Sequence, residues 1–259
     1  EYVLIMRCVV IVSQLSYHFI LEVVKLVNEQ VLSSRLMQVG KQVPLGARLA
    51  DIGSDHAYLP TYLVLKQQIP FAVAGEVVRG PYESAKKQVA KNGLENQIIV
   101  RLADGLAAIH AEDQIDAISI AGMGGTLIRN ILENGKQQGQ LTGNETLILQ
   151  PNVGEATLRN WLIRNDYEIR HEEILEENQK IYEIIVAIPS DRNLSYSKKE
   201  LFFGPILLKD RSLIFLQKWQ KELTNKQRVL KELTKAQELP LEKIAEVKEQ
   251  LQWIEEVLA

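Results

Sequence analysis

Residues 47 to 189 alternate short apolar runs, rich in β-branched side chains, with stretches in which apolar residues recur at helical spacing. Two such periods alternating along one chain are typical of a parallel sheet whose strands are joined by helices. The sequence therefore predicts an α/β fold with strands at 48–52, 71–75, 98–102, 117–120 and 146–149 and helices at 59–66, 82–92, 126–136 and 155–164.

The end of this region has a different pattern. "YEIRHEEILEE" and "KIYEIIVAIP", at 167–177 and 180–189, are strand-like runs separated only by Asn178 and Gln179. A two-residue connection predicts an antiparallel hairpin. A parallel, Rossmann-like sheet that ends in an antiparallel pair is typical of class I methyltransferases rather than of ordinary dinucleotide-binding folds.

The remainder of the chain has the composition of long charged helices. Leu216, Trp219 and Leu223 recur at steps of three and four, and the same spacing returns from Ile244. This spacing predicts an antiparallel helical hairpin with a coiled-coil seam. The predicted organisation is an atypical apolar extension at 1–30, a sheet domain at 31–189 and a helical hairpin domain at 190–259.

The two arms of the predicted hairpin differ in charge. Residues 209–235 carry eight Lys or Arg against three acids, whereas 236–259 carry two against six. Either the arms attract each other and leave their outer faces solvated, or the basic arm follows a phosphate backbone. The second alternative assigns nucleic-acid contacts to Lys218, Lys221, Arg228 and Lys231.

Overall charge and cysteine content exclude several classes of protein. A formal net charge of −3 does not suit a protein that coats nucleic acid with a uniformly basic surface. The single cysteine, Cys8, excludes an internal disulfide framework and a multi-cysteine zinc site, so we expect no metal ion and a cytoplasmic location. Charged side chains such as Arg7 and Glu22 interrupt the apolar start too soon for the about 20 residues of a membrane helix, so no membrane partner is expected.

Four predicted strands end in short polar or glycine-containing segments, "DIGSDH", "GE", "ADG" and "AGMG". The carboxyl ends of parallel strands lie at one edge of a sheet, so these segments are expected to form one ligand site. The expected site residues are Asp51, Gly53, Asp55, His56, Glu76, Asp104, Gly105, Ala121, Gly122, Met123 and Gly124.

The acids at this edge discriminate between ligands. A dinucleotide brings a pyrophosphate, which needs amide donors and is repelled by Asp51 and Asp55. S-adenosylmethionine has no phosphate, and both acids attract its ammonium and sulfonium. We therefore expect S-adenosylmethionine, with Glu76 accepting from the ribose hydroxyls and Asp104 accepting from the adenine amine. Alternatively, Asp51 caps a helix and His56 is a hydrogen-bonded structural residue.

Six blocks of the sequence carry a resemblance to a known family. "LSSRL", "LADIGSDHAYLP", "AGEVVRGPYESA", "RLADGL", "IAGMGGTLI" and "LILQPN" together resemble the TrmK family of bacterial tRNA (adenine(22)-N1)-methyltransferases. The resemblance implies a class I methyltransferase fold, S-adenosylmethionine as methyl donor and tRNA as substrate, methylated at the D-arm adenine 22. Residues 1 to about 30 depart from the family, whose chains begin near "LSSRL". Arg35 in that block is an expected RNA contact.

The implied chemistry assigns three candidate catalytic residues. Adenine N1 is largely unprotonated at neutral pH and attacks the methyl group directly, so catalysis is chiefly alignment. Asp55, followed by His56, is the candidate that stabilises or deprotonates the cationic product. Asn152 is the candidate that binds the adenine edge, and its alternative role is to cap a helix ahead of Glu155. A stacked or paired base must first be extruded.

Two further functions remain open at this point. One is a non-catalytic tRNA-binding protein that retains the methyltransferase fold, and the other is a small-molecule methyltransferase. A measurement of S-adenosylmethionine binding distinguishes a methyltransferase from the non-catalytic tRNA-binding protein, which has no need of the cofactor. A nicotinamide dehydrogenase is disfavoured by the missing glycines, and a monomer is the expected oligomeric state.

Overall fold

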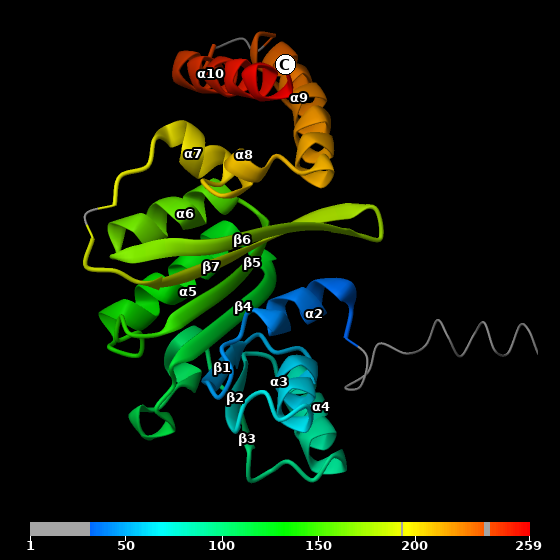
Figure 1. Ribbon diagram of the computed structural model, residues 1–259, viewed down its shortest axis with the longest axis vertical. Coiled ribbons are helices and arrows are strands. Elements are labelled where there is room, and N and C mark those ends of the chain that lie inside the picture. Colours follow the sequence, from blue (N-terminus) through cyan, green and yellow to red (C-terminus); the bar gives the residue numbers. More distant parts are fainter. Residues whose placement is uncertain (1–31, 193, 236–238) are drawn as a thin grey trace, which may run out of the picture.

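A computed structural model describes residues 32–192, 194–235 and 239–259. Seven strands form one sheet in the order β3-β2-β1-β4-β5-β7-β6 (Figure 1). The first five strands along the chain are parallel, and β7 lies antiparallel between β5 and β6. The strands are β1 (Arg48–Ile52), β2 (Phe71–Glu76), β3 (Ile98–Leu102), β4 (Ala117–Gly124), β5 (Thr146–Val153), β6 (Tyr167–Glu177) and β7 (Lys180–Pro189).

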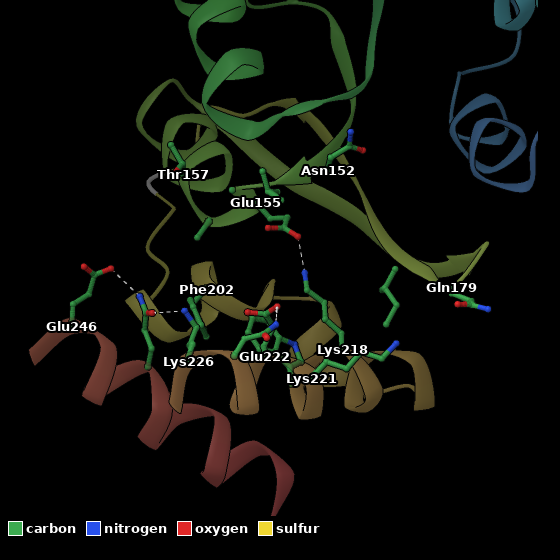
Figure 2. A pocket seen from close by; sticks show the side chains of 17 residues that line it. Asn152, Glu155, Thr157, Gln179, Phe202, Lys218, Lys221, Glu222, Lys226 and Glu246 are labelled. Carbon is green, nitrogen blue, oxygen red and sulfur yellow. Dashed lines mark hydrogen bonds and ion pairs between the residues drawn. The ribbon is translucent and has the colours of Figure 1, made fainter. Parts of the chain in front are cut away.

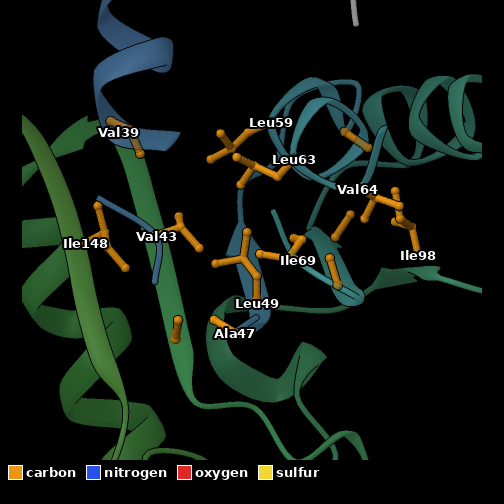
Figure 3. Packing of buried hydrophobic residues seen from close by; sticks show 14 of the residues in the cluster. Val39, Val43, Ala47, Leu49, Leu59, Leu63, Val64, Ile69, Ile98 and Ile148 are labelled. Carbon is orange, nitrogen blue, oxygen red and sulfur yellow. The ribbon is translucent and has the colours of Figure 1, made fainter. Parts of the chain in front are cut away.

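Helices cover both faces of the sheet and divide the core in two. Successive side chains of a strand point to opposite faces, so Leu49 packs with Val39 and Leu59 (Figure 3), whereas Ala50 packs with Ile128. The first face is covered by α2 (Ser34–Lys41), α3 (Tyr58–Leu65) and α4 (Arg79–Lys91), and the second by α5 (Gly125–Gln137) and α6 (Glu155–Arg164).

The predicted α/β sheet and its terminal antiparallel pair are confirmed, and the bounds of α4, β4 and β5 differ most from the prediction. Helix α4 begins at Arg79, three residues before the predicted start, because Pro81 lies in the first turn, where its missing N–H has no partner to lose. Strands β4 and β5 run past their predicted ends because Gly124 still pairs with Val153 beyond an irregularity in the register. The glycine-rich segment is therefore partly strand.

A helical region follows the sheet. Its two long helices lie side by side, as predicted for a hairpin, whereas the coiled-coil seam and the domain boundary at residue 190 stay predictions. Two short helices that the sequence did not predict precede them, and Phe203 from the first packs with Trp219 and Ile254. Ile174 of β6 contacts the same cluster, which joins this region to the sheet. The helices are α7 (Lys198–Phe203), α8 (Leu207–Asp210), α9 (Leu213–Leu233) and α10 (Leu241–Leu258).

The apolar extension predicted at 1–30 lies outside the described residues. Within the described ranges, no helix is both long enough and apolar enough to cross a membrane.

Candidate active site at the carboxyl edge of the sheet

The chain leaves β1 through a tight left-handed turn. Gly53 has a φ of +70°, which favours glycine, and an added Cβ would also lie 2.2 Å from the Met123 methyl carbon and displace it. Asp55, His56 and Ala57 follow with φ values of +43°, +66° and +56°. Three successive non-glycine residues in this region are energetically unfavourable, and such strain clusters at functional sites.

Asp51, at the base of this turn, is held by neutral donors. Its side chain is buried, and its carboxylate accepts hydrogen bonds from Ser54 Oγ at 2.5 Å and Ser119 Oγ at 2.6 Å. Burial raises the pKa of this carboxyl group above its ordinary value. The helix-cap alternative for Asp51 is wrong, because α3 has Ala57 as its N-cap and no side-chain cap. Asp51 orders the turn on which Asp55 and His56 lie.

Glu76, at the end of β2, joins the same turn. It is 5% exposed, and its Oε1 accepts a hydrogen bond from the Asp55 backbone N–H at 2.5 Å. Burial raises the pKa of Glu76, and the charges of Asp51 and Asp55 raise it further. Among the residues that the structure describes, no Lys or Arg side chain pairs with Asp51 or Glu76.

Asp55 and His56 present their side chains at the surface of this edge. Their side chains are 82% and 44% exposed, and His56 Nε2 lies 3.5 Å from Asp55 Oδ1. The His56 ring also stacks on Tyr58, with 5.3 Å between ring centroids. Both predicted catalytic side chains are therefore open to a substrate that approaches the edge.

Asn152 belongs to a polar network that sequence reasoning only partly found. Its Nδ2 donates to the Gly122 carbonyl at 2.8 Å, and its Oδ1 accepts from Gln150 Nε2 at 3.1 Å. Gln150, fully buried, also accepts from the Gly122 N–H at 3.0 Å and from Arg35 Nη1 at 2.5 Å. The helix-cap alternative for Asn152 is wrong, because Gly154 is the N-cap of α6. A glutamine within the apolar run "LILQPN" was the available signal for this network.

The end of β3 completes the edge. Asp104 is exposed there, and the preceding residue, Ala103, donates its N–H to the Glu76 carbonyl at 2.8 Å. Gly105 follows with a φ of +53° and begins a short 3-10 helix. The structure thus brings the predicted residues of four strand ends to one edge. Within the described ranges, no group of three or more His, Cys, Asp or Glu side chains is placed to hold a metal ion.

The predicted RNA contacts fall into different settings. Arg35 lies at the edge beside Gln150, whereas Lys221, Arg228 and Lys231 are exposed on α9. Lys218 is 16% exposed, and its Nζ lies 2.6 Å from a carboxylate oxygen of each of Glu155 and Glu183. A phosphate contact by Lys218 does not fit this arrangement, because two carboxylates already balance its charge.

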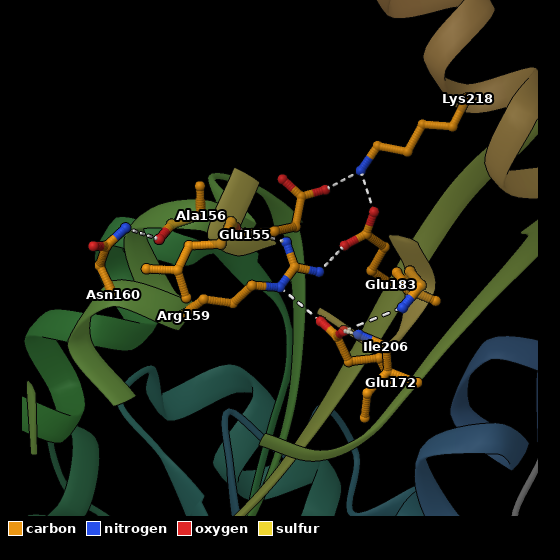
Figure 4. A network of polar contacts seen from close by, with 10 residues as sticks. Glu155, Ala156, Arg159, Asn160, Glu172, Glu183, Ile206 and Lys218 are labelled. Carbon is orange, nitrogen blue, oxygen red and sulfur yellow. Dashed lines mark hydrogen bonds and ion pairs between the residues drawn. The ribbon is translucent and has the colours of Figure 1, made fainter. Parts of the chain in front are cut away.

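Lys218 belongs to a buried ionic junction that the sequence did not reveal (Figure 4). The Arg159 guanidinium, fully buried on α6, lies 2.7 Å from Glu172 Oε1 and 2.5 Å from Glu183 Oε2. Glu172 also accepts from the Ile206 N–H at 2.8 Å. Burial alone would lower the pKa of Arg159, but Glu183 and Glu172 raise it. The junction joins α6, β6 and β7 to the C-terminal helices.

Comparison with known proteins identifies the family. A family model of the tRNA (adenine(22)-N(1))-methyltransferase TrmK matches residues 49–256. The Bacillus subtilis (strain 168) tRNA (adenine(22)-N(1))-methyltransferase is 45% identical over 237 residues, which cover 89% of this chain and 98% of that relative. The chain belongs to the TrmK family.

Solved structures of similar sequence have the same fold. The B. subtilis TrmK crystal structure gives a TM-score of 0.82 at 43% identity and covers 89% of this chain and 100% of that one. M. capricolum TrmK in complex with S-adenosyl-homocysteine gives 0.76 at 28%, covering 88% and 97%. A Streptococcus pneumoniae protein in complex with S-adenosyl-L-methionine gives 0.79 at 46%, covering 88% and 100%.

The TrmK family uses S-adenosylmethionine, as expected from the sequence, and the edge fits this cofactor. Asp51 and Glu76 are buried acids without a cationic partner among the described residues, which favours a ligand that carries positive charge.

Proposed function

We propose that this chain transfers the methyl group of S-adenosylmethionine to N1 of adenine 22 in tRNA, at the carboxyl edge of its sheet. Membership of the TrmK family supports the reaction. The observation that carries the location is the pair of buried acids, Asp51 and Glu76, which end adjacent strands and are held only by hydroxyl and amide donors.

The cofactor-binding residues are proposed from their places at the strand ends. Glu76 accepts from the ribose hydroxyls with the carboxylate oxygen that does not bind Asp55, and the exposed Asp104 accepts from the adenine amine. Asp51 acts by ordering the turn. Backbone room for the cofactor comes from Gly53 and Gly105 and from the segment Ala121, Gly122, Met123 and Gly124.

The bound cofactor supplies an electrophilic methyl group on a sulfonium. Asn152, held by Gly122 and Gln150, presents its amide to the adenine edge and aligns N1 for attack. The methylated adenine is cationic, and the exposed Asp55 carboxylate stabilises it or takes a proton from its amine, with His56 at 3.5 Å as the next acceptor. Arg35 lies beside this network and is proposed to contact the RNA.

tRNA is proposed to approach along α9, where exposed cations such as Lys221 and Arg228 are available to its phosphates. A tRNA substrate supports a cytoplasmic location. A monomer stays our prediction for the oligomeric state.

Nucleoside mass spectrometry tests the proposal directly. Purified protein is incubated with S-adenosylmethionine and a tRNA transcript, with a transcript carrying guanine at position 22 as the control. We expect 1-methyladenosine in the first transcript and none in the second. Binding of tRNA without methylation would instead identify a non-catalytic RNA-binding protein, and methylation of both transcripts would contradict the assignment of position 22.

A further inference from the structure

A cavity of about 540 Å³ lies between the end of β5, the start of α6 and the two long C-terminal helices (Figure 2). Asn152 lines one side of it, and Lys221, Asn225 and Lys226 of α9 line another. We propose that this cavity holds a nucleotide adjacent to the target adenine and fixes its phosphate with Lys221 and Lys226. The proposal rests on the proposed tRNA methylation and names the part of the RNA that this site takes.

The size of the cavity favours a nucleotide over a duplex. About 300–1,000 Å³ is usual for sites that enclose a small ligand, and a double helix is far too large to enter. Asn152, which we place at the adenine edge, lines the same cavity. A strand that places its target base at Asn152 therefore has an adjoining space for the next nucleotide.

The cations of the cavity wall differ in their availability. Lys218 already forms ion pairs with Glu155 and Glu183. Lys221 is exposed and has no ion-pair or hydrogen-bond partner within the described part of the chain. Lys226 donates only to a neutral amide oxygen of Gln250, at 2.7 Å. Burial lowers the pKa of Lys226, so an anion beside it would favour its charged form. Lys221 and Lys226 are thus the two cations available to a phosphate.

The acids of the cavity wall are engaged to different degrees. Glu155 pairs with Lys218, and Glu246 pairs with Lys243 at 2.7 Å. Glu222 accepts only a long hydrogen bond, of 3.4 Å, from Asn225. Glu222 is therefore the acid that opposes a phosphate in this cavity, and its removal is expected to strengthen RNA binding.

Aromatic side chains complete the wall. Phe202 and Trp219 line the cavity with their ring centroids 4.8 Å apart, and Lys226 Nζ lies 5.4 Å from the Phe202 ring centroid. The Trp219 indole N–H is buried and has no hydrogen-bond partner in the described structure. Sites for single-stranded nucleic acid combine cations that follow the backbone with aromatic rings that contact bases. The lining has both components, although only Phe202 is partly exposed, because Trp219 is 4% exposed.

Two double variants of equal charge test the proposal in the full chain. Lys221→Gln with Lys226→Gln removes both cavity cations. Lys87→Gln with Lys248→Gln removes two exposed cations of α4 and α10 that do not line this cavity and whose side chains have no ion-pair or hydrogen-bond partner among the described residues. Glu222→Gln is the third variant. Fluorescence anisotropy gives the tRNA Kd at several salt concentrations, calorimetry gives the S-adenosylmethionine Kd, and circular dichroism checks the fold.

We expect the cavity double variant to raise the tRNA Kd about tenfold or more. The dependence of log Kd on log salt concentration should flatten by about 0.7, since the two lysines neutralise one phosphate and each single-strand phosphate contributes about 0.7. The control double variant should change the Kd less than about threefold, Glu222→Gln should lower it, and cofactor binding should stay unchanged in all three. Equal losses in the two double variants, or no loss in the cavity variant, would overturn the proposal.

Methylation by the wild-type protein separates this proposal from the proposed function. No 1-methyladenosine with the wild-type protein would contradict the function itself. Normal wild-type methylation with unchanged tRNA affinity in the cavity variant would contradict only the nucleotide site.

Discussion

The carboxyl edge and the ionic junction both bury carboxylates, but they compensate them differently. At the junction, Glu172 and Glu183 lie against the buried Arg159. At the edge, Asp51 and Glu76 have only hydroxyl and backbone amide donors among the described residues. Buried charge is unfavourable unless it is paired. The buried acids of the junction are therefore paired with cations of the chain itself, whereas the acids of the edge are those that we propose a cationic ligand neutralises.

The directions of the pKa shifts follow this difference. Burial raises the pKa of Asp51 and of Glu76, and no Lys or Arg side chain among the described residues pairs with either carboxylate to offset that desolvation. At the junction, Glu183 and Glu172 outweigh burial and raise the pKa of Arg159. The charged form of Arg159 is thus favoured at the junction. At the edge, a nearby positive charge would favour the ionised forms of Asp51 and Glu76.

The largest expected effect comes from breaking the junction. Arg159→Met leaves the buried Glu172 without a counterion and Glu183 with Lys218 alone, and we expect the free energy of unfolding to fall by about 3–5 kcal/mol. Chemical denaturation measures this loss. The matched control is Arg164→Met, an exposed arginine on the same helix, which should change stability by less than about 0.5 kcal/mol. A loss below 1 kcal/mol in Arg159→Met would show that the junction is not needed for stability.

A smaller effect, confined to turnover, is expected at the edge. Asp55→Asn keeps the shape of the side chain and removes its charge, so the cationic product loses the carboxylate that we propose stabilises it. We expect kcat for tRNA methylation to fall about a hundredfold, with a smaller change in tRNA affinity, as for an interaction made mainly in the transition state. Single-turnover methylation and tRNA binding measure the two quantities. Wild-type kcat in this variant would make Asp55 a structural residue.

The smallest expected effect is a dependence of stability on pH. A carboxyl group whose pKa is raised on folding stabilises the fold below its ordinary pKa and loses that contribution as the pH rises through the raised value. For Glu76 the loss begins above its ordinary pKa of 4.5. Urea denaturation should show the wild-type protein losing stability relative to Glu76→Gln as the pH rises from there towards neutrality. If the stability difference between the wild-type protein and Glu76→Gln did not change with pH, or changed in the opposite direction, Glu76 would not be a buried acid without a compensating charge.

The sequence predicted the edge well because its signals are local. The predicted site residues lie at the carboxyl ends of strands or shortly after them, and parallel strands bring these ends together, so Asp51, Glu76 and Asp104 could be grouped before any contact was seen. The extension of β4 to Gly124 was missed because glycines are read as turn residues, and only pairing with β5 shows that the strand continues.

The junction was missed because its partners are distant in sequence. Arg159, Glu172, Glu183 and Lys218 come from four elements, and each alone has the pattern of an exposed charge. Lys218 and Lys221 are one turn apart on α9, but one is enclosed by carboxylates and the other is free of partners within the described residues. Helical spacing does not distinguish them, because the difference comes from tertiary contacts.

Titration calorimetry with S-adenosylmethionine tests the central claim most directly, using Glu76→Ala at the edge and Lys218→Met at the junction. The account predicts that Glu76→Ala loses about 1.5–3 kcal/mol of cofactor binding free energy through the loss of charge-assisted hydrogen bonds. Lys218→Met should bind the cofactor with the wild-type Kd, because its charge is used only within the junction. An unchanged Kd in folded Glu76→Ala, or an equal loss in the two variants, would contradict the account.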